Sequence, residues 1–488
     1  MKIILSEGIN RIYVQSLCMA FFHGIKFPLD DQDNEDGMEL IVNLQQNYNS
    51  ILCNAILKTK SNCVEGSLEY QRSNDENDKR EVKTAVGQLV YNLCKQVTGK
   101  DIEWGILTGI RPSKVCAELL SKFSEEIVFE ILTKRYFLSS DKAKLLLEVT
   151  KNEASIMQMT DDRKCSIYIS IPFCPSRCTY CSFISYAGKK LFDLIPSYLE
   201  RLIKDIKSTI SLIEELKLQI SCIYIGGGTP TILNEAQLKM ILEAISQLVD
   251  VSTLDEFTLE GGRPDTITEE KLLIAKKYGV TRISVNPQSL NDCVLQKIGR
   301  NHTAKDFFEA YDKVSKAGIE SINTDLIAGL DGDDFESFKG TINKIIEINP
   351  ENVTVHTFCV KKSAQILHDN EQIFDLEEKT AIDSVNYAYK MLSKNGFSPY
   401  YLYRQKNTVG NLENVGYARK GHLGLYNVFM MSDAHTVFGI GAGSTTKLVK
   451  NIDGKTEILR IFSQKYPYEY LRDEQKTDEQ IKEFFFRR

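Results

Sequence analysis

SIYISIPFCPSRCTYCSF, residues 166–183, is an apolar, β-branched run that leads directly into three cysteines. The run predicts a strand, and Cys174, Cys178 and Cys181 form a C-x3-C-x2-C loop at its end. Three thiolates at this spacing can hold three corners of a [4Fe–4S] cube, because its irons prefer sulfur ligands. No fourth cysteine lies close by in the sequence, so we expect one iron to remain open.

A structural zinc loop and three incidental buried thiols are the alternatives, although zinc sites usually show paired C-x2-C knuckles and a fourth Cys or His ligand. The spacing resembles the signature of the radical S-adenosylmethionine (SAM) enzymes, and Tyr180 and the Ile-Pro-Phe before Cys174 match that pattern. The resemblance implies that the open iron chelates the amino and carboxylate groups of SAM. It also implies that one electron from the cluster breaks the sulfonium bond and releases a 5′-deoxyadenosyl radical.

The chain has 488 residues, 42% of them hydrophobic, which is enough for about three globular domains with sizeable cores. Its formal net charge is only −6, and Lys and Arg are mixed with Asp and Glu throughout. No basic field therefore indicates nucleic acid or an anionic lipid surface as a partner. We expect a small-molecule ligand.

Glu7 and Arg11 interrupt the N-terminal stretch where a signal peptide needs a continuous apolar core, and no run approaches the roughly 18 apolar residues of a membrane span. The sequence therefore predicts a cytoplasmic protein with no membrane span. The other cysteines are scattered singly, without a disulfide framework, and we expect reduced thiols. They are Cys18, Cys53, Cys63, Cys94, Cys116, Cys165, Cys222, Cys293 and Cys359.

Residues 1–160 are predicted to form an N-terminal α+β accessory domain. The expected elements are a strand over MKIIL, a helix over Ile9–Phe22, strands around Leu40, Ile51–Leu57 and Ser67–Tyr70, a solvated loop over Gln71–Glu81, and helices from Val82 to Met159. In LTGIRPSKV, Arg111 and Lys114 flank the expected start of a helix capped by Ser113. These cations could hold a carboxylate, or the segment could be an ordinary solvated turn.

Residues 161–382 alternate between strand and helix patterns. Strands are expected at SIYISI, SCIYI, EFTLE, RISVN, ESINTDLI and NVTVHTF, with helices near 194–218, 235–249, 269–278, 304–317 and 335–348 between them. This order implies parallel strands joined by right-handed crossovers. The sequence therefore predicts an α/β fold, a partial (β/α)6 barrel.

Unusual polar and glycine residues follow these strands, at the end where barrel enzymes build their sites. Gly226-Gly227-Gly228-Thr229-Pro230 follows the second strand and lets the backbone approach a ligand. Further along the chain come Glu260, Gln288, Arg300 and Asp325. Each of these side chains could be a structural hydrogen-bonder, but their recurrence at one rim favours ligand contacts.

Residues 383–488 form a third, aromatic and glycine-rich region, which we expect to cover the substrate. Tyr400, Tyr401, Tyr403, Arg404 and Gln405 could offer a planar apolar face with a cation, or they could belong to a core or an interface. Gly439, Gly441 and Gly443 are expected to bring the backbone close to another segment, and TDEQIKEFFFRR predicts an amphipathic helix.

The motifs IPFCPSRCTYC, GGGTPT, EGGRPDTIT, NTDLIAGL, YYLYRQKN and FGIGAG together resemble the oxygen-independent coproporphyrinogen III oxidases (coproporphyrinogen dehydrogenases), in particular the HemZ-type branch. The resemblance covers about Lys164–Lys447. It implies SAM contacts at Tyr168, Tyr180, Gly227, Gly228, Thr229, Glu260, Gln288, Arg300 and Asp325. The implied reaction removes a hydrogen from each of two propionate β-carbons, and loss of CO2 and an electron leaves vinyl groups. A tetrapyrrole substrate and a reducing partner such as flavodoxin or ferredoxin are also implied.

Ser170 stands where the better-characterised branch of that family has a histidine, and Ser182-Phe183 follows the third cysteine where that branch has glycine and a further cysteine. The use of a second SAM is therefore open. Two other classes also remain. One is a haem chaperone, whose His-Asn-x-x-Tyr-Trp motif is absent although His422 and Tyr426-Asn427 lie in the corresponding region. The other is a haem-opening or methyl-transferring radical SAM enzyme.

Overall fold

The computed structural model describes residues 1–22, 24–28, 37–72, 75–181, 186–359, 373–405, 408–452, 454–473 and 477–486. Two compact units are present, each assembled from separate segments. The first comprises Met1–Thr150, Asn370–Ile382 and Leu402–Glu413, and the second comprises Lys151–Asp369, Asp383–Tyr401 and Asn414–Arg488. The division into residues 1–160, 161–382 and 383–488 stays a prediction.

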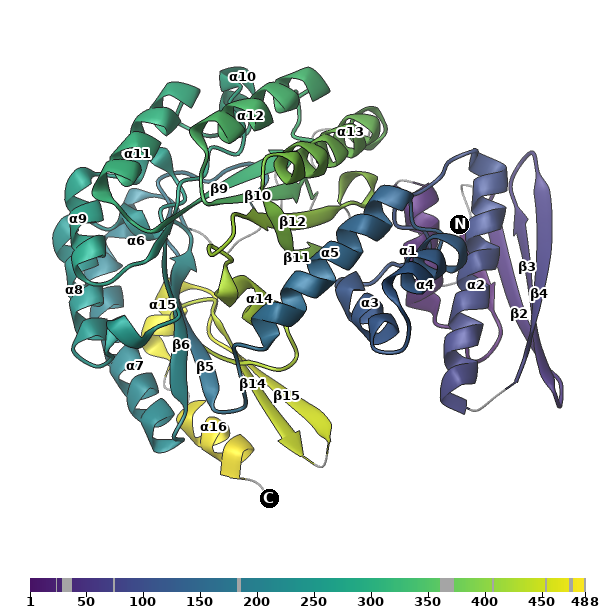
Figure 1. Cartoon of the computed structure of the whole chain (residues 1–488), viewed down its shortest axis with the longest axis horizontal. Coiled ribbons are helices and arrows are strands. Elements are labelled where there is room, and N and C mark those ends of the chain that lie inside the picture. Colours follow the sequence, from purple (N-terminus) through teal and green to yellow (C-terminus); the bar gives the residue numbers. More distant parts are fainter. Residues whose placement is uncertain are drawn as a thin grey trace. The chain divides into compact units, whose positions relative to one another are not determined.

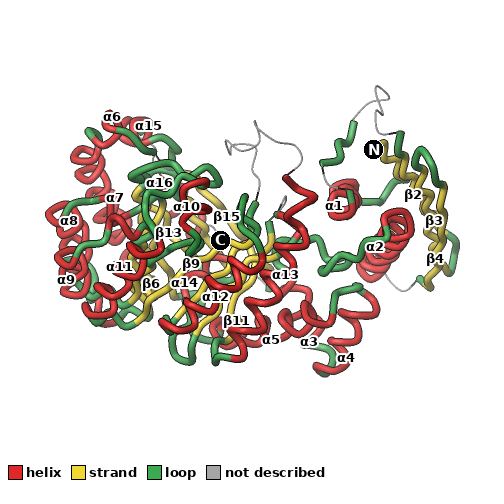
Figure 2. Tube along the Cα trace, turned by 90° about the horizontal axis from the view of Figure 1, so that it is seen from above, coloured by secondary structure: helices red, strands yellow, loops and turns green. Residues whose placement is uncertain are grey.

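The first unit contains a four-stranded sheet with two helices, α1 (Arg11–Phe21) and α2 (Asp75–Thr98), packed on one face (Figure 2). The strands in spatial order are β1 (Lys2–Leu5), β2 (Glu39–Gln46), β3 (Ser50–Lys58) and β4 (Cys63–Gln71). Alternate residues of β3 are buried, because successive side chains of a strand point to opposite faces. The expected strands and the first helix are confirmed, and this helix starts where Asn10 accepts the amide of Tyr13.

Two expectations for this unit are wrong. The loop expected over Gln71–Glu81 is helical from Asp75 onward, because acidic residues favour the first turn of a helix even before apolar spacing begins. Helix α3 (Pro112–Leu120) starts after Arg111, so Ser113 lies inside the helix and is not its cap. The remaining helices are α4 (Glu125–Glu130), which continues into a short π-helical turn, and α5 (Ser140–Met157).

The second unit is built on an eleven-stranded sheet whose central six strands are parallel. These strands are β5 (Lys164–Ile171), β6 (Gln219–Gly227), β7 (Glu256–Glu260), β8 (Arg282–Ser284), β9 (Ser321–Ala328) and β10 (Asn352–Thr357), each beside the next. The six-unit α/β fold expected from the sequence is confirmed. The strand order of the described residues has two ends, so this barrel is partial.

An outer layer of helices follows the curve of the sheet (Figure 1). It contains α6 (Lys189–Phe192), α7 (Ile195–Glu215), α8 (Glu235–Ser246), α9 (Glu269–Lys277), α10 (Asp292–Lys297), α11 (Ala304–Ala317) and α12 (Phe335–Ile348). Capping boxes at Asn234 and Thr303 fix the starts of α8 and α11. The core lies between these helices and the sheet, where alternate residues of β5 meet the apolar face of α7.

The last part of the chain extends both ends of this sheet. At one end lie β11 (Ser398–Arg404) and β12 (Glu413–Ala418), and at the other lie β13 (Thr436–Ile440), β14 (Thr445–Ile452) and β15 (Lys455–Phe462). Strand β13 is parallel to β5. A Cβ atom at Gly441 would lie 2.7 Å from the carbonyl oxygen of Ser170, and one at Gly439 would lie 2.6 Å from that of Thr445, so the close approach expected at these two glycines is confirmed.

The remaining helices are α13 (Ile373–Lys394), α14 (Leu425–Met431), α15 (Pro467–Arg472) and α16 (Thr477–Phe486). Helix α16 coincides with the amphipathic helix expected in the tail, and Ile481 is its buried residue. No described helix combines the length and the apolar character that crossing a membrane requires.

Candidate functional site

The cysteine loop and the glycine turn lie against each other at the carboxyl ends of β5 and β6. The amide of Gly228 donates to the carbonyl oxygen of Ile171 at 2.8 Å, and the amide of Thr229 donates to that of Phe173 at 2.8 Å. A Cβ atom at Gly228 would lie 2.6 Å from the Phe173 oxygen and 2.9 Å from Cys174 Sγ. Only glycine therefore permits this approach of the turn to the loop.

Backbone hydrogen bonds also hold the cysteine loop in place. The amide of Cys174 donates to the carbonyl oxygen of Tyr186 at 3.0 Å, and the amide of Cys181 donates to that of Cys178 at 3.1 Å. Cys174 Sγ is 3.3 Å from the hydroxyl oxygen of Thr229. Cys178 is buried, and Cys174 and Cys181 are half-buried. Ser182 and Phe183, which depart from the better-characterised family pattern, lie outside the described residues.

The three cysteines carry the soft sulfur donors that the irons of a [4Fe–4S] cluster prefer. Within the described ranges, no group of three His, Cys, Asp or Glu side chains could hold a metal ion. A [4Fe–4S] cube binds thiolates at separate iron corners, so its ligands need not converge on one point. The soft thiol donors, the glycine turn and the buried cations described next fit such a group.

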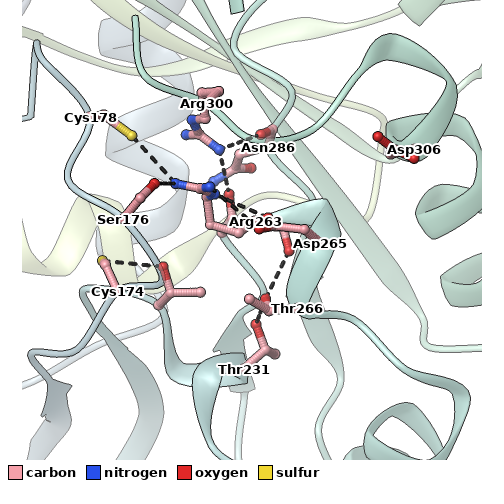
Figure 3. A network of polar contacts seen from close by, with 12 residues as sticks. Cys174, Ser176, Cys178, Thr231, Arg263, Asp265, Thr266, Asn286, Arg300 and Asp306 are labelled. Carbon is pink, nitrogen blue, oxygen red and sulfur yellow. Dashed lines mark hydrogen bonds and ion pairs between the residues drawn. The ribbon is translucent and has the colours of Figure 1, made fainter. Parts of the chain in front are cut away.

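Two buried guanidinium groups flank the loop (Figure 3). Arg263 pairs with Asp265 through Nε at 3.1 Å, and its Nη1 donates to Ser176 Oγ at 3.1 Å and to Cys178 Sγ at 3.6 Å. Arg300 Nη2 donates to the hydroxyl oxygen of Tyr180 at 2.9 Å. Its Nη1 donates to the carbonyl oxygens of Gly262 and Asn286, each at 3.2 Å. The loop therefore lies in a positively charged environment.

Glu260 ends β7 beside the glycine turn. Its Oε1 accepts a hydrogen bond from the hydroxyl of Tyr224 at 2.6 Å. Burial raises the pKa of Glu260 to about 7; the Tyr224 bond opposes that rise, and the negative charge of Asp325 adds to it. A nearby ammonium group would favour the ionised form, so Glu260 is suited to bind a cation.

Asp325 and Gln288 meet at the ends of β9 and β8. The amide of Gln288 donates to the carbonyl oxygen of Asp325 at 3.0 Å. Burial by itself raises the pKa of Asp325, but His356 at 3.9 Å and the Asn323 amide at 2.7 Å hold it below its usual range. Gln288 adopts a φ of 69°, and its buried Oε1 has no hydrogen-bond partner among the described residues. This orphan acceptor can receive a ligand donor.

Tyr168, Tyr224 and Tyr426 form a stack beside Glu260. The ring centroids of Tyr224 and Tyr426 are 4.5 Å apart, and Tyr168 lies 6.1 Å from each. Burial raises the pKa of all three hydroxyl groups, so these side chains remain neutral. They form an aromatic wall next to the rim carboxylates.

The structure thus gathers the expected site residues in three linked groups at one rim. Cys174 contacts Gly228 and Thr229, Tyr180 contacts Arg300, and Gln288 contacts Asp325. Glu260 lies against Gly226 of the same turn, whose added Cβ would be 2.7 Å from Oε2. Tyr168 joins through the aromatic stack.

Of the two alternatives for Tyr400–Gln405, a planar face for a ligand or a core, the burial of three of these side chains favours the core. Tyr400, Tyr401 and Arg404 are buried, with exposures of 1%, 7% and 3%. The Arg404 guanidinium donates to the carbonyl oxygens of Leu107 and Asn411 within the first unit. These side chains are core residues, because a buried cation must satisfy its donors within the protein.

His422 does not join the rim. Its Nδ1 lies 2.7 Å from Ser321 Oγ, at the amino end of β9, whereas the cysteine loop follows the carboxyl end of β5. Of the residues that correspond in position to the haem motif, Tyr426 therefore joins the aromatic stack, whereas His422 lies at the opposite end of the strands.

Sequence reasoning missed Arg263, Tyr224 and His356. Arg263 stands in the quoted motif EGGRPDTIT, where an arginine after a strand was a usable signal. His356 ends the sixth strand and could have been found by the same rule that found Asp325. Tyr224 offered no signal, because an aromatic residue inside a strand usually belongs to the core.

Comparison with known proteins agrees with this geometry. The model of the Radical SAM superfamily matches residues 168–345. The oxygen-independent coproporphyrinogen-III oxidase-like protein HemZ of Bacillus subtilis (strain 168) is 36% identical over 410 residues, covering 83% of this chain and 81% of that protein. The heme chaperone HemW of the same organism is 31% identical over 327 residues, covering 66% of this chain and 82% of that protein.

Among solved structures, the coproporphyrinogen III oxidase HemN of Escherichia coli, a radical SAM enzyme, matches with a TM-score of 0.51 and 21% identity. The match covers 67% of this chain and 72% of that one, and it shows that the fold is shared. The chain therefore belongs to the radical SAM family that includes HemZ and HemW. A [4Fe–4S] cluster and SAM are the cofactors of this superfamily.

Proposed function

We propose that this protein oxidatively decarboxylates two propionates of coproporphyrinogen III to vinyl groups, giving protoporphyrinogen IX. The observation that carries the proposal is the meeting of the cysteine loop with the glycine turn and rim carboxylates in a chain 36% identical to HemZ. Each propionate loses a hydrogen atom, CO2 and one electron, so the reaction also needs a one-electron acceptor.

Cys174, Cys178 and Cys181 are proposed to hold the cluster. The proposed SAM contacts are Tyr168, Tyr180, Gly227, Gly228, Thr229, Glu260, Gln288, Arg300 and Asp325. When bound, the cluster and SAM supply a 5′-deoxyadenosyl radical that can abstract a hydrogen atom from a propionate β-carbon.

The rim residues differ in what they offer to SAM. Glu260 and Asp325 offer carboxylates to its ammonium and hydroxyl groups, and Gln288 offers an unused acceptor. Arg300 offers a buried cation to its carboxylate. The stacked tyrosines exclude water from this side, which protects a reactive radical from quenching.

The electron donor is proposed to be a reducing partner such as flavodoxin or ferredoxin, and the location is proposed to be the cytoplasm. Cys63 and Cys293 are exposed free thiols. Exposed free thiols support a reducing compartment, which an oxygen-labile cluster also requires.

Anaerobic incubation with SAM, a reductant, an electron acceptor and coproporphyrinogen III tests this proposal. We expect protoporphyrinogen IX, CO2 and 5′-deoxyadenosine, and none of them from the Cys178→Ala variant. Chromatography of the tetrapyrroles together with CO2 measurement checks the outcome. Cleavage of SAM without loss of CO2 from the substrate would contradict the reaction.

A haem chaperone is the second candidate, favoured by the 31% identity to HemW. A chaperone would bind haem stoichiometrically and release no CO2. Haem titration followed by absorbance, run on the same preparation, separates the two candidates. A methylated or ring-opened product would instead favour the third class of radical SAM enzyme.

A further inference from the structure

Arg263 is a buried cation in the loop that follows β7. Its side chain is 4% exposed, and Asp265, two residues later, accepts from Nε and Nη2 at 3.1 and 3.4 Å. The short 3-10 turn Pro264–Thr266 places the carboxylate for this fork. Asp265 thus aims the remaining nitrogen, Nη1, away from itself (Figure 3).

Nη1 points at the cysteine loop. It donates to Ser176 Oγ at 3.1 Å and to Cys178 Sγ at 3.6 Å, which is within hydrogen-bond reach of a sulfur acceptor. Ser176 lies between two of the proposed cluster ligands and Cys178 is one of them, so Arg263 brings a positive charge to a ligand sulfur.

The charge balance around the loop favours an anion there. Arg300 is also buried, and among the described residues its guanidinium meets only neutral oxygens. Burial and the two arginines lower the pKa of His302 to about 4, so this neighbour is neutral. Asp265 alone, in the described part of the chain, forms an ion pair with either guanidinium. Two buried cations thus face one carboxylate.

A cluster held by three thiolates is negatively charged, and it becomes more negative when it accepts an electron. A hydrogen bond and a positive charge at a ligand sulfur stabilise the reduced form more than the oxidised form. We propose that Arg263 raises the reduction potential of the cluster through its hydrogen bond to Cys178, and so eases electron entry from a one-electron reductant. This inference rests on the proposed cluster ligands.

The test compares reconstituted clusters in the absence of SAM and tetrapyrrole. Arg263→Gln removes the charge, Arg263→Lys keeps it without the fork, and Lys271→Gln serves as the control. Lys271 donates to the carbonyl oxygens of Thr231 and Thr266 and braces the same turn without touching sulfur. Iron content and an anaerobic dithionite titration followed by electron paramagnetic resonance give the midpoint potential of each.

We expect Arg263→Gln to hold wild-type iron with a lower midpoint potential, Arg263→Lys to lie between it and the wild type, and Lys271→Gln to match the wild type. An unchanged midpoint in Arg263→Gln overturns the inference. An equal shift in Lys271→Gln overturns it too, because the geometry of the turn would then be the cause. Loss of iron from both Arg263 variants assigns the residue to folding of the loop.

The same measurements distinguish failure of the proposed decarboxylation from failure of the inference about Arg263. A wild-type protein that binds no four-iron cluster overturns the ligand assignment and this inference with it. A wild-type cluster whose midpoint responds to Arg263→Gln, in a protein that releases no CO2 from coproporphyrinogen III, supports the inference and contradicts only the decarboxylation.

Discussion

Lys142 in the first unit and Arg300 in the second are both buried cations, but they differ in what neutralises them. In the first unit, the ammonium of Lys142 lies 2.6 Å from Glu413 Oε1, and Trp104 Nε1 donates to Glu413 Oε2 at 2.6 Å. Arg404 lies over the Trp104 ring at 5.0 Å. In the second unit, Arg300 meets only neutral oxygens among the described residues. A carboxylate neutralises Lys142 inside the protein, whereas Arg300 forms no ion pair within the described part of the chain and can accept an anionic ligand.

The largest expected effect is the loss of the cluster. Replacing Cys174, Cys178 or Cys181 by Ala should abolish SAM cleavage and lower the iron content from about four per chain, because each thiolate holds one corner of the cube. Anaerobic reconstitution followed by iron analysis checks this. Cys165→Ala and Cys222→Ala, in the buried strands β5 and β6, are the matched controls and should retain cleavage. A triple cysteine variant that still cleaved SAM would refute the ligand assignment.

A large loss of stability is expected in the first unit. Glu413→Gln leaves the fully buried Lys142 beside a neutral amide, and breaking such a pair costs about 3–5 kcal/mol. Chemical denaturation followed by circular dichroism measures the change. Glu39→Gln breaks the exposed pair with Lys58 in the same unit and should cost less than about 1 kcal/mol. Equal costs in both variants would remove the expected contrast between the buried and the exposed ion pair.

A moderate effect on SAM binding is expected at the rim. Glu260→Gln and Arg300→Met should each weaken binding by about 1–3 kcal/mol, the range for hydrogen bonds to charged groups. Isothermal titration under anaerobic conditions measures the affinity. Glu256→Gln, at the opposite end of β7, removes a carboxylate that accepts from the Leu425 amide and should lower stability without changing SAM affinity. Unchanged binding in both rim variants would assign them to structure.

The smallest expected effect is a pH dependence centred on Glu260. Its pKa is raised from the usual 4.5 to about 7, so the folded chain binds the proton more tightly and the free energy of unfolding falls as pH rises between these values. SAM affinity should rise through about pH 7 as the carboxylate ionises. Glu260→Gln should flatten that profile.

Other titratable groups near Glu260 bear on this profile. They are Tyr168, Tyr224, Asp325, His356 and Tyr426. The tyrosines stay neutral through this range because burial raises their pKa values. A profile that persisted in Glu260→Gln would assign the titration to another group.

Much of the barrel could be predicted because its signals are local. Helices α11 and α12 match their expected limits, since Thr303 and Asp334 cap amphipathic repeats. Parallel strands place their carboxyl ends together. The cysteine loop and the polar residues that follow each strand could therefore be predicted to lie at one rim.

The remainder depended on contacts that no local pattern encodes. From the sequence, Arg404 and Tyr400 could belong to a ligand-binding face or to the core. Only the folded chain shows that carbonyl oxygens accept the hydrogen bonds of Arg404. The bond from Arg263 to Cys178 joins residues 85 positions apart. Residues 75–81 were misassigned because charged helix formers resemble a solvated loop when no apolar repeat accompanies them.

The pairing of β13 with β5 sets an order of events during synthesis. Ser166 and His435, which contact each other at 2.8 Å, are 269 residues apart, so one edge of the cysteine-bearing strand has no neighbour until residues 436–440 have been synthesised. An exposed strand edge is prone to wrong pairing, and non-local pairing is slow. The strand that leads into the cysteine loop therefore gains its second neighbour only when β13 is made, and until then this edge must be kept from wrong pairing.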